Sequence, residues 1–401
     1  MKVSVQCLKV TDMSDIIAKD AKFLAPTYRR FPLEIVRGKD ALCWDECGNE
    51  YIDMGSGIAV NSFGYCNEKW KSDVIRQLEQ LQHTSNLYYT RPATLLAEQL
   101  CNRTGLKQVF FGNSGAEANE CAIKVARAYA AHNKGSEYYN IITLNNSFHG
   151  RTITTLAATG QDVFHQQFLP LTDGFFYADA NDLDAIKKLV REQKIAAVMI
   201  ELVQGEGGVV ALDKDYVKHL AAFLDQNDVL LIVDEVQTGN GRSGTLYAFE
   251  QYDILPDIVS TAKGLGGGLP IGACMLGQKV ENVLTAGTHG STFGGNPVAC
   301  AGALSVLEML NDKLLSEVST KAEYLKKRFE GAKGILSVSG LGLMMGLEVE
   351  KNTADVITKC MENGVLVLSA KNKIRLLPPL NITFDQLEKA CDVIVAVCAE
   401  E

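Results

Sequence analysis

Long apolar runs, paired cysteines and blocks of basic residues are all missing from this sequence of 401 residues. Its longest apolar runs, 229–233 and 393–399, are far shorter than the roughly 20 residues that span a bilayer. The 39 Lys and Arg residues are outnumbered by 48 Asp and Glu and are nowhere concentrated, so neither nucleic acid nor an anionic membrane is an expected partner. The eleven cysteines form no CxxC pair, so no disulfide framework and no metal site are expected.

The first 15 residues have neither the apolar core of a signal peptide nor the Arg-rich character of a transit peptide, which predicts a cytoplasmic protein. With 47% hydrophobic residues and only 9 Pro, the composition is that of an ordinary globular protein. The chain is two to three times the roughly 150 residues of a typical domain, which predicts two domains.

Short apolar segments alternate with amphipathic stretches between about residues 105 and 276. The segments expected to be strands are 108–111, 140–144, 196–200, 230–233, 258–261 and 272–276. Because several are apolar on both faces and helical stretches separate them, the pattern predicts a mostly parallel α/β sheet that is covered on both sides.

The remaining segments predict a smaller α+β unit. Residues 297–332 read as largely helical and lead into expected strands at 346–350, 365–368 and 374–377 and helices at 355–363 and 384–397. A hairpin is expected over 41–53, with its turn at Gly48 and Asn49. We therefore expect an N-terminal segment (1–60) that packs with a C-terminal small domain (306–401), and a large domain (61–305) between them.

A possible phosphate site follows the first strand of the large domain. Ser114 and Glu117 have the spacing of a helix capping box, and Gly115 lets backbone amides approach a ligand. The free N–H groups at a helix start can hold a phosphate. An ordinary helix cap without a ligand is the alternative, and the segment alone favours it.

Two carboxylates, Asp234 and Glu235, end the apolar strand at 230–233, at the edge where α/β sheets bind ligands. Consecutive strand residues point to opposite faces, so a metal ion shared by both is disfavoured. We expect one of the two carboxylates to face a site.

Lys263 follows the next strand and precedes the glycine-rich stretch 264–268. A lysine buried at the mouth of a sheet can lose its proton and attack carbonyl groups, although a solvated surface lysine is the commoner case. An imine-forming amine, an acid and a phosphate cradle together are what a pyridoxal 5'-phosphate site needs.

Three motifs strengthen this hypothesis, and they resemble the signature of the class III, pyridoxal-phosphate-dependent aminotransferases. They are DEVQTG at 234–239, AKGLGGG at 262–268 and GSTFGGNP at 290–297. Stretches at 32–38, 57–61, 146–152, 204–208 and 375–380 resemble the acetylornithine subgroup in particular. The resemblance covers about residues 22–400 and implies fold type I, in which a large domain with a mostly parallel seven-stranded sheet carries a small α+β domain.

The resemblance also implies the residues that hold the cofactor. Lys263 would bind it covalently and shuttle the proton, and Asp234 would pair with its ring nitrogen. Gln237 would bond its phenolic oxygen, while Phe148 and Val236 would cover its two ring faces. Its phosphate would be held by Ser114, Gly115, Ala116 and, from the neighbouring subunit, Thr292. The expected active form is therefore a homodimer with shared active sites.

The implied reaction moves the terminal amino group of N2-acetylornithine to 2-oxoglutarate, giving N-acetylglutamate 5-semialdehyde and glutamate; arginine biosynthesis runs the reverse direction. Arg151 would hold the distal carboxylate and Arg375 the one beside the reacting carbon, each by a two-pronged contact. Glu206 would neutralise Arg375 while acetylornithine is bound, and Ser291 would lie on the substrate side. Without the resemblance, both arginines read as surface residues.

Other activities remain open at this point. Ornithine, succinylornithine and 4-aminobutyrate aminotransferases differ in the pocket for the acyl group, and a non-catalytic pyridoxal-phosphate-binding protein is a distant alternative. His149 and His289 are expected to be structural. The chain departs from the family pattern at 64–68, near the expected substrate entrance, and at Leu202. The first departure bears on substrate preference.

Overall fold

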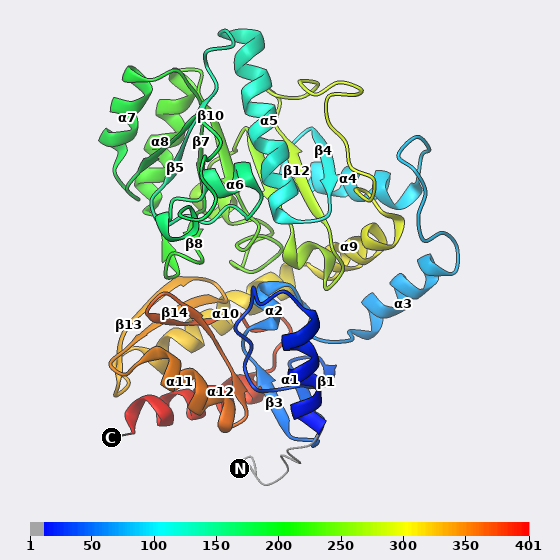
Figure 1. Ribbon diagram of the computed structural model, residues 1–401, viewed down its shortest axis with the longest axis vertical. Coiled ribbons are helices and arrows are strands. Elements are labelled where there is room, and N and C mark those ends of the chain that lie inside the picture. Colours follow the sequence, from blue (N-terminus) through cyan, green and yellow to red (C-terminus); the bar gives the residue numbers. More distant parts are fainter. Residues whose placement is uncertain (1–11, 401) are drawn as a thin grey trace.

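A seven-stranded sheet forms the centre of the computed structural model, which describes residues 12–400 (Figure 1). In spatial order its strands are β4 (Gln108–Gly112), β12 (Gly272–Leu276), β11 (Ile258–Thr261), β10 (Leu230–Asp234), β7 (Ile195–Ile200), β5 (Asn140–Leu144) and β6 (Phe175–Ala178). Within this sheet β12 is antiparallel to both of its neighbours, and the other pairs are parallel. The mostly parallel α/β sheet predicted from the sequence is confirmed.

Helices cover both faces of this sheet because alternate strand residues point to opposite sides. Ala197 and Ile232 pack against α5 (Gly115–Asn133). Their chain neighbours Val198 and Val233 belong to the larger core on the other face. The helices that contribute to this larger core include α4 (Arg91–Thr104), α7 (Leu183–Glu192), α8 (Lys214–Gln226) and α9 (Pro297–Met309). A short helix, α6 (Ile153–Ala158), lies beside α5.

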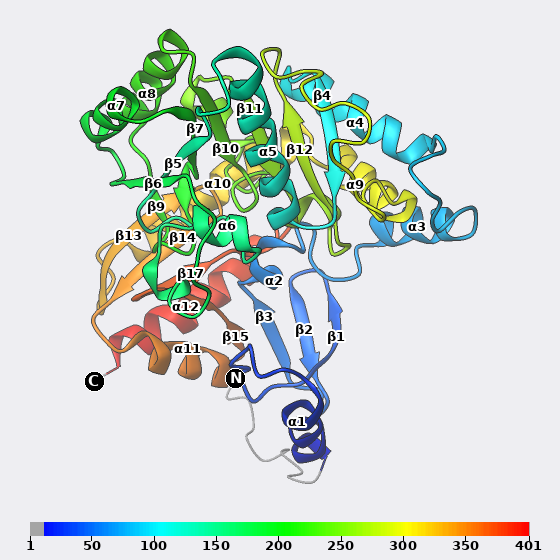
Figure 2. The same ribbon diagram turned by 45° about the horizontal axis from the view of Figure 1, so that its top comes forward.

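Two four-stranded sheets lie at one end of the large sheet (Figures 1 and 2). One is antiparallel and contains β13 (Ile335–Leu341), β14 (Met344–Val349), β17 (Lys373–Leu376) and β16 (Leu368–Ala370). The other contains β1 (Ile35–Lys39), β2 (Leu42–Asp45), β3 (Glu50–Asp53) and β15 (Val365–Leu366). Because β3 pairs with β15, the N-terminal strands share a sheet with a strand more than 300 residues later. The proposed domain boundaries at 60 and 305 stay a prediction.

The remaining helices and short strands complete the described chain. They are α1 (Asp12–Phe23), α2 (Ser56–Ala59), α3 (Glu68–Leu78), β8 (Val203–Gln204), β9 (Val210–Ala211), α10 (Asp312–Phe329), α11 (Thr353–Glu362) and α12 (Phe384–Ala399). Across residues 12–400, no helix is both long and apolar enough to cross a membrane.

The structure differs from the sequence prediction in the smaller sheets. The expected strand at 365–368 is two strands, since β15 pairs with β3 whereas β16 pairs with β17 in a different sheet. The helical stretch at 297–332 is interrupted after α9, where the Asn311 side chain caps α10 by accepting a hydrogen bond from Leu314 N. The hairpin at 41–53 is confirmed, with Gly48 at φ +82° in its turn.

Candidate active site

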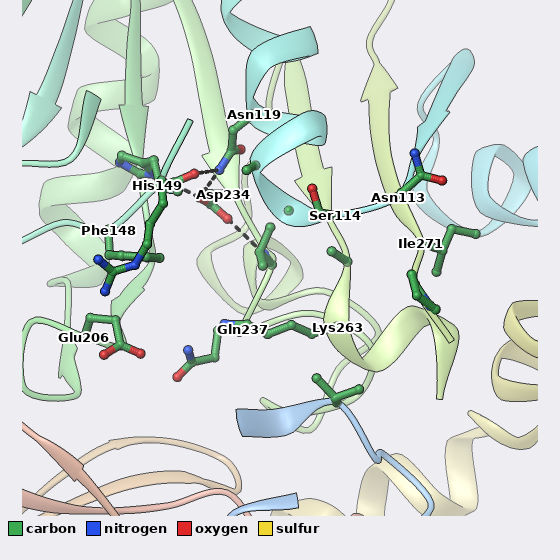
Figure 3. A pocket seen from close by; sticks show the side chains of 18 of the residues that line it. Asn113, Ser114, Asn119, Phe148, His149, Glu206, Asp234, Gln237, Lys263 and Ile271 are labelled. Atoms are coloured by element: carbon green, nitrogen blue, oxygen red, sulfur yellow. Dashed lines mark hydrogen bonds and ion pairs between the residues drawn. The ribbon is translucent and has the colours of Figure 1, made fainter. Parts of the chain in front are cut away.

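A cavity of about 480 Å³ lies beyond the ends of β4, β5, β7, β10 and β11, on the side that faces the smaller sheets (Figure 3). Ligand sites of α/β proteins commonly occupy such strand ends. Ten residues expected at the site line this one cavity: Ser114, Gly115, Ala116, Phe148, Arg151, Glu206, Asp234, Val236, Gln237 and Lys263.

Lys263 lies in a short 3-10 helix (Lys263–Gly266) that follows β11, and its backbone is in the left-handed region at φ +44°. Such a conformation is strained for a residue with a side chain and is typical of functional sites. Burial lowers the pKa of the Lys263 amine below its usual value, and the nearby charge of Arg375 lowers it further, while Glu206 opposes them. Lys263 is partly buried and lines the cavity, so it is not a freely solvated surface lysine.

Three hydrogen bonds orient the buried carboxylate of Asp234 at the end of β10. Oδ2 accepts from Asn119 Nδ2 at 2.7 Å and from His149 Nδ1 at 2.8 Å, and Oδ1 accepts from Val236 N at 3.0 Å. In Figure 3, Asn119 and His149 both lie beside Asp234, Asn119 above it and His149 to its left. Because an ionised carboxylate only accepts, Nδ1 is the protonated ring nitrogen of His149.

The neighbouring Glu235 points to the other face of the sheet, as strand geometry predicts. Its carboxylate accepts hydrogen bonds from Thr238 Oγ1 at 2.5 Å and Phe249 N at 2.8 Å. Burial raises the pKa of Glu235 to about 7. Asp234 alone of this pair lines the cavity.

The start of α5 forms the second part of the cavity wall. The Ser114 side chain caps the helix by accepting from Glu117 N, and the first-turn N–H groups of Gly115 and Ala116 lie at the helix end, where α-helices have no internal acceptors. A side chain at Gly115 would place Cβ 2.8 Å from Val236 Cγ1, so only glycine allows this close approach. The free N–H groups at this helix start can therefore hold an anion, and the apolar side chain of Val236 lies beside them.

A carboxylate that the sequence interpretation did not single out ties two loops of the site together. Glu201, after β7, accepts from Phe148 N at 3.0 Å and from Gly205 N at 3.3 Å. Burial raises the pKa of Glu201 to about 7, while the nearby imidazole of His149 opposes this shift. The sequence feature that could have identified Glu201 is an acidic residue directly after an apolar strand. The same feature identified Asp234.

Arg375 reaches the site from β17, in a smaller sheet. Its Nη1 donates to Glu206 Oε1 at 2.6 Å and to Gln237 Oε1 at 3.3 Å. Gly205 allows this arrangement, because a Cβ there would lie 2.5 Å from Gln237 Oε1. The Arg375 side chain is only 4% exposed, whereas that of Glu206 is 33% exposed, so Glu206 is the partner with room to move.

Two of the expected site residues lie elsewhere in this chain. Ser291 Oγ accepts from Asn113 Nδ2 and from Gly294 N, and neither Ser291 nor Thr292 is part of the cavity wall. The substrate role of Ser291 and the cofactor role of Thr292 therefore stay predictions. His289 contacts Lys124 through its Nδ1, outside the cavity, in line with its structural interpretation.

These residues fit pyridoxal 5'-phosphate. The cavity offers a desolvated amine at Lys263, a fixed carboxylate at Asp234 and a helix start for a phosphate, and its volume lies in the usual range for small-molecule sites. Phe148 and Val236 add apolar surfaces suited to a flat ring.

Comparisons with known proteins show the family to which the chain belongs. The family model described as aminotransferase class-III matches residues 23–398. The acetylornithine aminotransferase of Haemophilus ducreyi is 51% identical over 95% of this chain and 98% of that protein. The one of Methanocaldococcus jannaschii is 43% identical over 95% and 97%.

Solved structures give the same result for the fold. The ornithine aminotransferase of Toxoplasma gondii superimposes with a TM-score of 0.92 at 34% identity, covering 98% of this chain and 96% of that one, and that structure has PLP at partial occupancy at its active site. The N-acetylornithine aminotransferase of Stenotrophomonas maltophilia superimposes with a TM-score of 0.82 at 33% identity, covering 96% and 98%. The chain belongs to the class-III aminotransferases, the pyridoxal-phosphate-dependent transaminases of fold type I.

Proposed function

We propose that the enzyme transfers the terminal amino group of N2-acetylornithine to 2-oxoglutarate. The observation that carries this proposal is the placement of Lys263 in one cavity with Asp234, the start of α5 and Glu206, which forms an ion pair with Arg375 behind the cavity wall. Relatives named acetylornithine aminotransferase, at up to 51% identity over nearly the whole chain, support the choice of substrate.

When bound, pyridoxal phosphate supplies a carbonyl that accepts the amino group and a ring that withdraws electrons from the reacting carbon. Lys263 Nζ would take the proton from that carbon and deliver it to the cofactor carbon that receives the amino group, a step helped by the lowered pKa of the amine. Asp234 would hold a proton at the ring nitrogen. Phe148 and Val236 would pack on the ring, and Gln237 would bond its phenolic oxygen. Ser114, Gly115 and Ala116 would bind the phosphate.

Two arginines select the substrates. Arg151 binds the carboxylate that lies away from the reacting carbon, which both acetylornithine and glutamate possess. Arg375 binds the second carboxylate of glutamate and 2-oxoglutarate. Acetylornithine has no carboxylate at that position, so Glu206 keeps its ion pair with Arg375 during that half of the cycle. A buried guanidinium without this partner would be strongly unfavourable.

Replacing Glu206 by Gln is expected to change the preference between donors. The substitution removes the charge that balances Arg375, so kcat/KM should fall for acetylornithine and rise for glutamate. Their ratio should shift about 10- to 100-fold, since a hydrogen bond between charged groups contributes about 1.5–3 kcal/mol. Half-reaction rates followed by cofactor absorbance measure both constants. Glu206→Asp, which keeps the charge, is the control, and an unchanged ratio in Glu206→Gln would contradict the assigned role.

A second candidate activity is ornithine aminotransfer, which the TM-score of 0.92 to the Toxoplasma gondii enzyme favours. Steady-state rates with acetylornithine, succinylornithine, ornithine and 4-aminobutyrate, each with 2-oxoglutarate as acceptor, distinguish these activities. The proposal requires the highest kcat/KM for acetylornithine. A higher value for ornithine would replace it.

We further propose a homodimer with shared active sites and a cytoplasmic location. The loop that contains Thr292 is joined to a neighbouring segment, because Asn86 Nδ2 donates to the carbonyls of Ser291 and Gly294. Large apolar side chains are exposed there: Leu87, Tyr88, Tyr89 and Phe293. Such a patch is typical of an interface, and a second copy would bring Thr292 to the phosphate cradle of its partner.

Mixed dimers test the sharing of sites. Lys263→Ala and Thr292→Asp are each expected to inactivate the enzyme, the second by placing a negative charge beside the phosphate. Co-expressed, they should recover about 25% of wild-type activity, since half of the dimers are mixed and each has one intact site. The control pairs Lys263→Ala with Asp234→Ala, two changes on one side of the site, and should recover none. Equal recovery in both mixtures would exclude a shared site.

A further inference from the structure

A T-shaped pair of aromatic rings surrounds the guanidinium of Arg151. Arg151 Cζ lies 4.7 Å from the ring centre of Phe164 and 5.5 Å from that of Phe148. The two rings are 5.9 Å apart at an interplanar angle of 78°. A cation within about 6 Å of a ring centre is attracted by the negative ring face. Arg151 therefore interacts with two rings, of which only that of Phe148 belongs to the cavity wall.

The two rings are the neighbours that hold the Arg151 guanidinium, whereas Arg375 is held by hydrogen bonds. Among residues 12–400, no side chain or carbonyl forms a hydrogen bond or ion pair with the Arg151 guanidinium, whereas Arg375 is held by Glu206 and Gln237. The five N–H donors of Arg151 thus remain available to a ligand. Their direction is set by ring contacts instead of hydrogen bonds.

The position of Phe164 is itself fixed by its neighbour. Phe164 ends a short 3-10 helix (Asp162–Phe164), and the next residue, His165, is buried. His165 Nε2 lies 2.9 Å from Leu156 O and 2.7 Å from Thr159 O, so the imidazole donates to the end of α6. Because α6 begins two residues after Arg151, this contact joins the segment that contains the ring to the segment that contains the guanidinium.

We propose that Phe164 is a positioning residue that sets substrate specificity: its ring holds the Arg151 guanidinium in the orientation that binds the carboxylate remote from the reacting carbon. Phe164 itself does not line the cavity. The inference deepens the proposed function and rests on it, since it requires that Arg151 binds a substrate carboxylate.

The test compares Phe164→Leu, which keeps apolar volume without a ring, with Phe164→Tyr, which keeps the ring. The probe is glutarate, a dicarboxylate with neither an amine nor a carbonyl to react, and calorimetric titration of the holoenzyme gives its Kd. Because Arg151 is exposed, Phe164→Leu should weaken glutarate binding about 2- to 5-fold, the range expected for an exposed cation–π contact, while Phe164→Tyr should bind as the wild type does. KM for 2-oxoglutarate should rise in parallel with little change in kcat.

A double-mutant cycle with Arg151→Gln decides whether Phe164 acts through Arg151. The effect of Phe164→Leu on the glutarate Kd should disappear when Arg151 is already Gln. Additive losses, or equal losses in the Leu and Tyr variants, would overturn the inference. A wild-type enzyme that binds glutarate but does not transfer amino groups would instead contradict the proposed function, so the two failures are distinguishable. Thermal midpoints of all variants show whether the fold is retained.

Discussion

Replacement of Lys263 by alanine is expected to lower the turnover of acetylornithine and glutamate by more than about 10⁴-fold. The variant loses the group that moves the proton at the reacting carbon, a step for which general acid–base catalysis alone contributes about 10²- to 10⁴-fold, and it loses the covalent link to the cofactor. The visible absorbance of the bound cofactor should change as well. Steady-state rates and the absorbance spectrum of the purified protein measure both effects.

Lys263→Arg separates charge from reactivity. An arginine keeps a positive charge in the cavity but does not lose its proton, so it should be as inactive as the alanine variant. A small primary amine added to Lys263→Ala should restore part of the rate, because the cavity left by the side chain admits it, whereas it should do nothing for Lys263→Arg. Near-normal turnover in either variant would refute the role of Lys263.

The residues that act chemically could be predicted from the sequence, because each follows an apolar strand. Asp234 is the last residue of β10 and Lys263 follows β11, and these strands are parallel neighbours in the sheet, so their carboxyl ends lie together. A sequence in which apolar runs end in polar residues therefore predicts that these polar side chains lie close together at one edge of the sheet. The resemblance added Phe148 and Gln237, which no local pattern distinguishes from ordinary loop residues.

The residues that support the chemistry could not be predicted in the same way. Asn119 lies on α5 among buried Ala, Cys and Val residues, and only the fold shows that its amide bridges His149 O and Asp234. The sequence predicts a structural role for His149. The structure shows a contact that fits this role, because His149 Nδ1 bonds the carboxylate of Asp234. Such contacts join segments 30 to 115 residues apart. The periodicity of apolar residues along the sequence does not predict contacts between segments so far apart.

The fold shows a similar division. Strands in the middle of the large sheet, such as β7 and β10, are buried along their whole length and are visible as apolar runs. Some of the strands that were not predicted, such as β6 and β13, are partly exposed: β6 lies at the edge of its sheet, and β13 includes Ser and Gly. Edge strands lack the pattern that full burial imposes.

The second large effect is expected for Asp234→Asn. The amide is nearly the same size, so contacts with Asn119, His149 and Val236 can be retained in part, but it has no negative charge to hold a proton at the cofactor's ring nitrogen. Loss of one partner from a buried ion pair costs about 3–5 kcal/mol, which corresponds to a fall in kcat of about 10²- to 10⁴-fold. Single-turnover rates with acetylornithine measure this effect apart from product release.

Glu235→Gln is the matched control, because it removes a carboxylate from the next residue on the same strand. Glu235 faces away from the cavity and bonds Thr238 and Phe249, so its loss should affect stability and leave kcat within a few-fold of the wild type. The pH dependence of the cofactor's absorbance should change in Asp234→Asn only. If the two variants lost activity equally, the effect would reflect disturbance of the end of β10, and the assigned role of Asp234 would be wrong. If only Asp234→Asn loses most of its activity, the negative charge of Asp234, on the face of the sheet that lines the cavity, must support the reaction.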